Sequence, residues 1–340
     1  MGDGYIDKVN LKELSNEQIS GFLTNFGLPL YRVRQLIHWM YEKRVSDISE
    51  ISEFSKSLRD ELSKKAYISK LEIVSKQASL DGTVKYLFAL EDSNTIESVL
   101  IPDEKRLTLC ISSQVGCKLG CRFCLTGSIG FVRNLKAFEI VDQIMCVEND
   151  RHINNIVMMG MGEPLDNFDN VVEAIRRIIG LIQMSKRKIT LSTAGIVPNM
   201  QRIFKMVPEI NLAVSLNATT DDVRSFIMPI NKRYSLSELI RACKEIPLSP
   251  RRRITFEYVM LEGINDASDD AKRLVKLLRG IKSKVNLIPL NGYNAGLKAP
   301  SEKQILAFQK ILTDANMTAF IRKSRGSDIL AACGQLKASY

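Results

Sequence analysis

Apolar positions near the N-terminus repeat with a helical period. Residues 10–66 predict a small helical module, and its clearest stripe follows the i, i+3, i+4, i+7, i+8 spacing of an amphipathic helix. The next segment, residues 68–103, changes to the pattern of strands, with an Asp81-Gly82 turn between the first two. The helical stripe consists of Val33, Leu36, Ile37, Met40 and Tyr41.

From about residue 107, strand patterns alternate with helix patterns. Apolar strands that alternate with helices predict parallel strands buried on both faces. The expected strands are 106–113, 153–160, 188–195, 210–217, 253–261 and 284–291, and amphipathic stretches of helical length between them include 168–183, 266–280 and 302–315.

The pattern as a whole predicts an α/β fold. Six strand–helix units fit a partial (β/α)6 barrel or an open sheet, and either arrangement gathers functional residues at the carboxyl ends of the strands. We expect a helical accessory domain at 1–66, a β linker or extension at 67–104, and the barrel at 105–340.

Composition narrows the class of protein. Of 340 residues, 45% are apolar and 25% charged, as in ordinary globular proteins. No apolar run approaches the roughly 18–20 residues of a membrane-spanning helix, and no signal peptide is visible. We therefore expect a cytoplasmic protein without a membrane partner, whose seven cysteines are reduced and serve as ligands, catalysts or core residues. Two histidines leave little material for a His-rich zinc site or a Ser-His-Asp triad.

The net charge of +10 is distributed unevenly. Residues 1–66 carry 10 basic and 10 acidic side chains, whereas residues 184–253 carry 13 basic and 5 acidic ones. The last 25 residues add a further excess of three basic over acidic side chains. A basic body favours a polyanionic partner, and nucleic acid is the usual one. The alternative is a basic surface that binds no partner.

The sharpest chemical feature is a C-x3-C-x2-C triplet, Cys117, Cys121 and Cys124, in the loop after the first barrel strand. Structural zinc needs four ligands, so the triplet is incomplete for zinc unless Cys110 completes it. A 4Fe–4S cluster held by three cysteines keeps one iron open for a small molecule, as a reactive metal requires. The spacing favours the open cluster, and zinc stays as the alternative.

The triplet, placed after the first strand of a βα array, resembles the radical S-adenosylmethionine (SAM) superfamily. Longer blocks are similar to the RlmN/Cfr adenosine methyltransferases, and the helical module resembles the accessory domain of that family. The resemblance thus covers nearly the whole chain. The matching blocks are CISSQVGCKLGCRFCLTGSIGFVRNL, VMMGMGEPLDN, LSTAGIVP, MPINKRYSL and IRKSRGSDILAACGQL.

The resemblance implies a radical methyl transfer to adenine that uses two SAM molecules per turnover. One SAM methylates a cysteine that matches Cys333, and a radical derived from the second removes hydrogen from this S-methyl group. The carbon radical then adds to the base and forms a covalent RNA–protein adduct. Glu97 matches the base that deprotonates the adduct, and Cys110 matches the thiol that releases it through a disulfide. Taken alone, Glu97 has the pattern of a surface strand carboxylate, and both cysteines have that of core residues.

The same resemblance implies SAM contacts, and all the matching residues lie at predicted strand ends. Gly162 and Glu163 would meet the SAM amino group; the others are Ser192, Ser215, Leu216, Asn217 and Asn291. Asn217 stands where many members have His, and Gly292 where many have Pro. Cys146 and Cys243 match no role, and we expect them in the core.

The implied substrates are C2 of adenine 2503 in 23S rRNA and C2 of adenine 37 in tRNAs. Alternatives are Cfr-like methylation of C8 of the same rRNA adenine, a non-catalytic, metal-stapled RNA-binding protein, and a thiol redox protein. The motifs favour C2. The implied partners are 23S rRNA, tRNA and an external, flavodoxin-like electron donor, and we expect a monomer.

Overall fold

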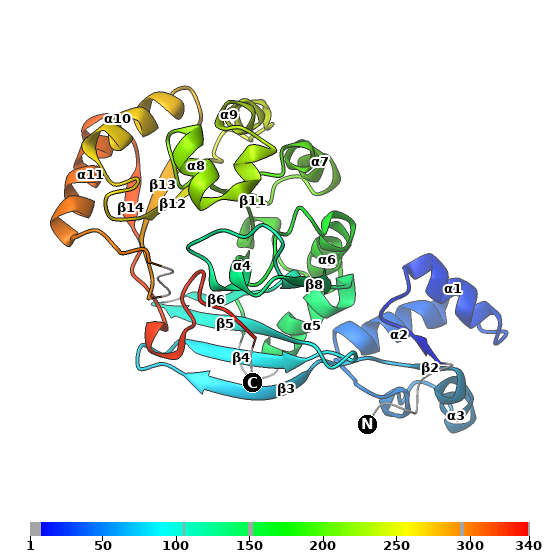
Figure 1. The fold of residues 1–340 in the computed structure, drawn as a ribbon. Coiled ribbons are helices and arrows are strands. Elements are labelled where there is room, and N and C mark those ends of the chain that lie inside the picture. The colour runs from blue at the N-terminus through cyan, green and yellow to red at the C-terminus, as the bar shows by residue number, and fades with distance from the viewer. Residues whose placement is uncertain (1–7, 105, 149–151, 293–295, 339–340) are drawn as a thin grey trace.

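The computed structural model describes residues 8–104, 106–148, 152–292 and 296–338. Its main body is built on one ten-stranded sheet with the order β14-β13-β12-β11-β10-β9-β6-β5-β4-β3. Helices form an arc on the outer face of the parallel part of this sheet, and the N-terminal module lies to one side (Figure 1). No helix within the described ranges has the length and apolarity needed to cross a bilayer.

Seven strands of this sheet, β6 and β9 to β14, run parallel to one another, and a helical crossover connects each to the next. All six predicted strands are confirmed, and β14 is a seventh that the pattern did not predict because it is only three residues long. The parallel strands are β6 (Arg106–Cys110), β9 (Asn155–Met158), β10 (Ile189–Thr193), β11 (Asn211–Ser215), β12 (Ile254–Met260), β13 (Ser283–Pro289) and β14 (Ala319–Ile321).

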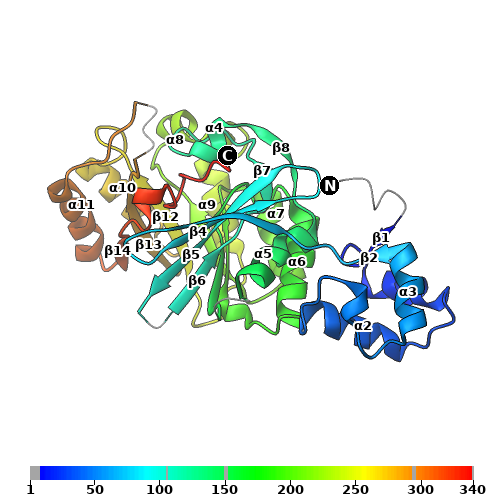
Figure 2. The same cartoon turned by 90° about the horizontal axis from the view of Figure 1, so that it is seen from below.

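The crossover helices cover the outer face of the sheet (Figure 2). Their apolar side chains are part of the buried core. The three predicted helices are confirmed as α6, α10 and α11. In chain order the crossover helices are α5 (Ala137–Glu148), α6 (Phe168–Gly180), α7 (Val197–Met206), α8 (Asp221–Ile227), α9 (Leu236–Glu245), α10 (Ser268–Leu277) and α11 (Glu302–Asp314).

An antiparallel meander of β3 (Glu72–Ala78), β4 (Val84–Ala89) and β5 (Thr95–Asp103) extends the same sheet. The predicted turn between the first two strands is confirmed, and Gly82 has a φ of 82° there. Strand β5 pairs with β6, so that Val99 lies opposite Cys110. Residues between the helical module and the barrel are therefore a continuous extension of the barrel sheet.

The buried side chains of the N-terminal module belong to the same hydrophobic cluster as the barrel core. The predicted stripe is confirmed in α2, where Leu36, Met40 and Tyr41 are buried and the other two positions pack against them. The elements of the module are β1 (Val9–Asn10), α1 (Asn16–Thr24), α2 (Tyr31–Tyr41), the short helix η1 (Ile48–Glu50), α3 (Lys56–Lys65) and β2 (Ala66–Tyr67).

Buried polar contacts attach this module to the barrel helices. The Lys12 ammonium lies 2.8 Å from Asp142 of α5, and both side chains are almost fully buried. Arg177 of α6 donates to the carbonyl of Lys12 at 2.5 Å and to the Tyr41 hydroxyl at 3.3 Å. Breaking such pairs would leave buried charges without partners, so the module and the barrel form one unit.

Candidate active site

The cysteine triplet lies in a tightly folded loop at the carboxyl end of β6. The loop is framed by β7 (Gln114–Gly116) and β8 (Phe131–Asn134), and Cys124 directly precedes α4 (Leu125–Ser128). Gly116 has a φ of 74°, and a Cβ there would lie 2.0 Å from the carbonyl oxygen of Gly130. Because only glycine fits this close approach, the backbone fixes where the loop leaves β7.

The three thiols share one electrostatic environment. Burial raises the pKa of Cys117 to about 12 and also raises the pKa values of Cys121 and Cys124. Cys121 interacts electrostatically with both of the other thiols. Buried thiols of this kind ionise only when a metal supplies positive charge, and soft thiolates suit iron–sulfur clusters.

The loop offers three thiols as metal ligands. Structural zinc takes four protein ligands, whereas three thiolates can each bind a different iron of a 4Fe–4S cluster and leave the fourth iron open. The donor set of Cys117, Cys121 and Cys124 therefore fits an iron–sulfur cluster better than zinc.

A C-terminal segment, residues 331–338, lies against the cysteine loop and carries the exposed Cys333. The segment is held by its backbone. Leu125 N–H donates to the Gly334 carbonyl at 2.6 Å, Thr126 Oγ1 to the Leu336 carbonyl at 2.7 Å, and Asn291 Nδ2 to the Cys333 carbonyl at 3.2 Å. These contacts place the Cys333 thiol at the carboxyl ends of the barrel strands.

Cys110 lies at the end of β6, within electrostatic range of Cys333. Cys110 is buried, and burial together with the neighbouring Cys333 thiol raises its pKa. The remaining two cysteines, Cys146 and Cys243, are buried core residues, as predicted. The structure thus brings Cys110, Cys333 and the triplet to one end of the barrel.

Glu97 lies in β5 and is 5% exposed, unlike the surface carboxylate that its local pattern alone suggests. Its Oε2 accepts hydrogen bonds from the N–H groups of Lys337 at 2.8 Å and Ala338 at 3.1 Å. Its Oε1 lies 3.1 Å from the Lys85 ammonium. The carboxylate is therefore fixed beside the segment that carries Cys333.

Gly162 and Glu163 follow β9 and pack against Gln114. Gly162 has a φ of 94°, and a Cβ there would lie 2.5 Å from the Gln114 Cβ. The Glu163 carboxylate accepts hydrogen bonds from Thr193 Oγ1 at 2.6 Å and Ala194 N–H at 2.7 Å. Burial nevertheless raises the pKa of Glu163 to about 7. A buried carboxylate with no cation beside it suits a positively charged ligand group.

The other residues matched to SAM binding lie at the carboxyl ends of β10, β11 and β13. Ser192, Ser215 and Asn291 are half-buried there, and Leu216 is buried. Asn217 has a φ of 56° and is used inside the protein: its Oδ1 accepts from Val259 N–H at 2.8 Å, and its Nδ2 donates to the Met228 sulfur at 3.1 Å.

Sequence reasoning did not predict two charged residues of this site. Arg224 of α8 is fully buried and donates to the carbonyls of Ala194, Ser215 and Leu216, which ties the ends of β10 and β11 together. Glu257 of β12 is buried within electrostatic range of Cys333. Glu257 interrupts an otherwise apolar strand, which is a usable signal, whereas the α8 pattern gives no sign that Arg224 turns inward.

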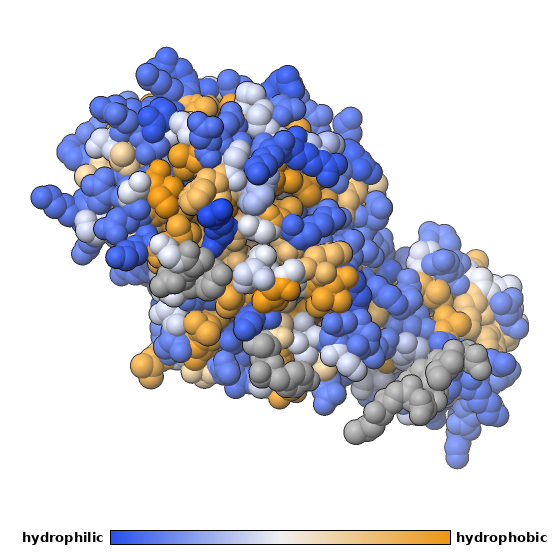
Figure 3. Space-filling view, in the orientation of Figure 1, coloured by the Kyte–Doolittle hydropathy of each residue, from blue (hydrophilic) through white to orange (hydrophobic). Residues whose placement is uncertain are grey.

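Apolar side chains are exposed beside the cysteine loop: Ile129, Phe131 and Val132. The space-filling view shows apolar surface on this face of the molecule (Figure 3). Lys118 lies over the Phe131 ring at 5.4 Å from its centroid. Such a mixture of cationic, aromatic and aliphatic groups at a barrel mouth suits a large, unsaturated and anionic substrate.

Comparisons with known proteins agree with this geometry. Residues 111–278 match the family model described as "Radical SAM superfamily", and residues 9–68 match "Ribosomal RNA large subunit methyltransferase N-terminal domain". The resemblance inferred from the sequence motifs is thereby confirmed.

Two curated relatives are each named "Dual-specificity RNA methyltransferase RlmN". The chain is 53% identical over 334 residues to that of Pelobacter propionicus, covering 97% of this chain and 96% of the relative. It is 50% identical over 335 residues to that of Geotalea uraniireducens, covering 98% and 97%.

A solved structure extends the agreement to the fold. The crystal structure of a radical SAM methyltransferase from Sphaerobacter thermophilus matches with a TM-score of 0.91 and 40% identity, covering 97% of this chain and 100% of that one. The predicted radical SAM barrel is confirmed. The chain therefore belongs to the RlmN family of radical SAM RNA methyltransferases, enzymes that use SAM and a 4Fe–4S cluster.

Proposed function

We propose that this enzyme methylates C2 of adenine in 23S rRNA and in tRNA, with Cys333 as the methyl carrier. The observation that carries the proposal is the position of Cys333. Cys333 is an exposed residue at the barrel mouth, on a segment fixed against the cysteine loop and within electrostatic range of Cys110, while burial raises the pKa of its thiol. A carrier must reach SAM and RNA in turn, and a residue on the surface of the mouth meets this need.

We propose that Cys117, Cys121 and Cys124 hold the cluster. When bound, the cluster supplies the electron that cleaves SAM and so starts the radical chemistry. The loop packs against the segment 331–338, since Leu125 and Thr126 both donate to it. A methyl group carried on the Cys333 sulfur therefore stays beside the cluster.

SAM is proposed to lie across the carboxyl ends of β9, β10, β11 and β13. The Glu163 carboxylate faces its amino group, since Glu163 is buried and no described cation pairs with it. Ser192, Ser215, Leu216 and Asn291 border the same space. Because both ends of the Asn217 amide have protein partners, we propose that Asn217 shapes the site mainly through its backbone.

Glu97 and Cys110 are proposed to complete the reaction. The radical adduct must lose one electron, which the bound cluster would take back, and the proton from C2. Glu97 accepts this proton, because its carboxylate is held beside the carrier segment. The Cys110 thiolate then attacks the Cys333 sulfur. A Cys110–Cys333 disulfide forms, the bond from Cys333 to the transferred carbon breaks, and the electron pair stays with the released CH2 group, which takes up a proton and becomes the methyl group of the base.

This product state needs two electrons from outside to restore the thiols. We therefore propose an external, flavodoxin-like reductant as a partner and a reducing compartment, the cytoplasm, as the place of work. The apolar group of Ile129, Phe131 and Val132 beside the cluster loop is consistent with a protein or RNA partner there. We propose that the enzyme acts as a monomer.

The test is mass spectrometry of rRNA and tRNA from a host that lacks its own enzyme. We expect 2-methyladenine with the wild type and none with Cys333→Ala, whose iron content stays unchanged. Cys110→Ala should accumulate a covalent RNA–protein species. Cys146→Ala is the matched control, since Cys146 is a buried core residue of α5 whose charged neighbours are Lys12, Lys70 and Asp142. A C8-methylated product, or normal turnover of Cys110→Ala, would refute the assignment.

A further inference from the structure

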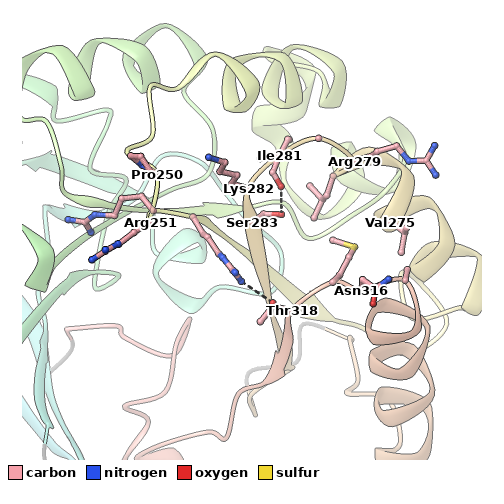
Figure 4. Close-up of a pocket in the computed structure, with 15 residues that line it drawn as sticks. Pro250, Arg251, Val275, Arg279, Ile281, Lys282, Ser283, Asn316 and Thr318 are labelled. Atoms are coloured by element: carbon pink, nitrogen blue, oxygen red, sulfur yellow. Dashed lines mark hydrogen bonds between the residues drawn. The ribbon is translucent and has the colours of Figure 1, made fainter.

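The strongest unexplained feature lies at the opposite end of the barrel. Two adjoining cavities of ≈960 Å³ and ≈730 Å³ share residues 250–253, and we call them together the basal groove (Figure 4). The groove lies where β10, β11, β12 and β13 begin, because its walls include Thr190, Asn211, Thr255 and Ser283. The active site lies where these strands end.

The basal groove is strongly cationic. Seven Lys and Arg side chains line it against a single carboxylate, Glu209, which is itself 3.6 Å from Lys186. In the described part of the chain, none of the seven forms an ion pair with a carboxylate. Four of the seven, Arg187 and Arg251 to Arg253, belong to the basic stretch that the sequence shows over residues 184–253.

Hydrogen bonds within the protein hold two of the arginines in place. Arg252 donates to the Asn211 side chain and to the Glu209 carbonyl, and Arg253 donates to Thr318 Oγ1 at 3.0 Å. Arg251, Arg279 and Lys282 are exposed around the groove (Figure 4). Exposed cations held this close together repel one another, and an anionic ligand relieves that repulsion.

The lining identifies the kind of anion. No aromatic side chain lines either cavity, so nothing in the groove can stack on a base. Contacts from Lys and Arg to phosphates position a nucleic acid without reading its sequence. An enzyme that acts on two different RNAs needs contacts of this sequence-independent kind.

Distance separates the basal groove from the target base. Strand β12 has seven residues, so at about 3.3 Å per residue the two ends of the sheet lie roughly 20 Å apart. An adenine inserted at the barrel mouth cannot bring its own phosphate to the groove. We propose that the basal groove is a second RNA site, which binds phosphates of the substrate outside the target loop. The proposal rests on the proposed function, since it takes RNA as the substrate.

The test removes three exposed cations of the groove in the variant Arg251→Gln/Arg279→Gln/Lys282→Gln. The matched control is Lys64→Gln/Arg241→Gln/Lys303→Gln, which removes three exposed charges that do not line the groove. Binding to a whole tRNA and to its isolated stem-loop with the target adenine is measured over a series of KCl concentrations, with the cluster-loaded enzyme. Thermal unfolding verifies that both variants fold.

Each lost phosphate contact lowers the slope of log K against log salt by about 0.7–0.9. For binding of the whole tRNA, we expect the slope of log K against log salt to fall by about two to three units in the groove variant. For the stem-loop, we expect the slope and the methylation rate to stay at their wild-type values. Equal slopes for the groove and control variants, or equal losses on both RNAs, would overturn the proposal. If the groove variant does not fold, Arg251→Glu alone provides the same comparison.

The two proposals fail in different ways. Absence of stem-loop methylation by the wild type would refute the proposed function, whereas the salt slopes with whole tRNA would still report on the groove.

Discussion

Replacing Arg224 by Met tests how the carboxyl ends of β10 and β11 are held at the active site. The Arg224 side chain is fully buried, and its guanidinium donates to the Leu216 carbonyl at 3.1 Å, to Ala194 at 2.7 Å and to Ser215 at 3.2 Å. Burial lowers the pKa of Arg224 to about 10, so the group is still charged at neutral pH. Methionine has similar length and no donor.

The expected loss follows from three acceptors that lose their donor: the Ala194 and Ser215 carbonyls and Asn231 Oδ1. The Leu216 carbonyl still accepts from the Ala218 N–H at 2.8 Å. A buried acceptor left without a donor costs about 1–3 kcal/mol. Removal of the buried cation recovers part of its desolvation energy, so we take the lower value, about 1 kcal/mol, for each acceptor. The sum is about 3 kcal/mol in the free energy of unfolding. Since the freed strand ends border the proposed SAM site, SAM affinity should fall at least tenfold.

Anaerobic urea unfolding followed by circular dichroism measures the first effect, and equilibrium dialysis of SAM the second. Arg241→Met is the control, because Arg241 is exposed on α9, and a surface change of this kind stays within about 0.5 kcal/mol. A free energy of unfolding for Arg224→Met within about 0.5 kcal/mol of the wild-type value would refute the reasoning. Normal SAM affinity in a destabilised variant would refute only the link to the site.

Three further predictions concern Gly162 after β9, Asp81 in the turn between β3 and β4, and the cluster. Gly162→Ala should weaken SAM binding, since its Cβ would lie 2.5 Å from the Gln114 Cβ; unchanged dialysis results would contradict this. Although desolvation opposes it, hydrogen bonds from Thr83 and Gly326 lower the pKa of Asp81 to about 2. The unfolded value is higher, so Asp81 stabilises the fold above about pH 4, and this contribution disappears as pH falls toward 2. Proteolysis of the C-terminal segment should therefore rise over that range in the wild type and be already high in Asp81→Asn. Anaerobic chelation of iron should speed hydrogen exchange in residues 117–128 and leave the basal groove unaffected.

Periodic patterns predicted most of the fold because long amphipathic elements decide it. The strands β6 and β9 to β13 and the stripe in α2 were visible in the sequence. The pattern missed β14, which is too short to show a period. Its place at the sheet edge depends on pairing with β13, and pairing is not a local property.

In the active site too, some features were predictable from the sequence and others were not. The spacing of Cys117, Cys121 and Cys124 predicts a metal centre, because ligands on one loop are close in sequence. The burial of Glu97 was not predictable from its strand, since the covering N–H groups come from residues 240 and 241 positions later. Arg224 likewise satisfies carbonyls from two other strand ends. Contacts over such separations are set by the tertiary fold.

The backbone attachment of the carrier segment affects how this enzyme can evolve. Carbonyl or N–H groups of Cys333, Gly334, Leu336, Lys337 and Ala338 make the contacts that fix its path. Any residue type that tolerates the local conformation offers the same groups. The exposed side chain of Lys337 is therefore free to vary, while the backbone of Cys333 keeps its place. Substitutions at such a surface position can accumulate without moving the segment.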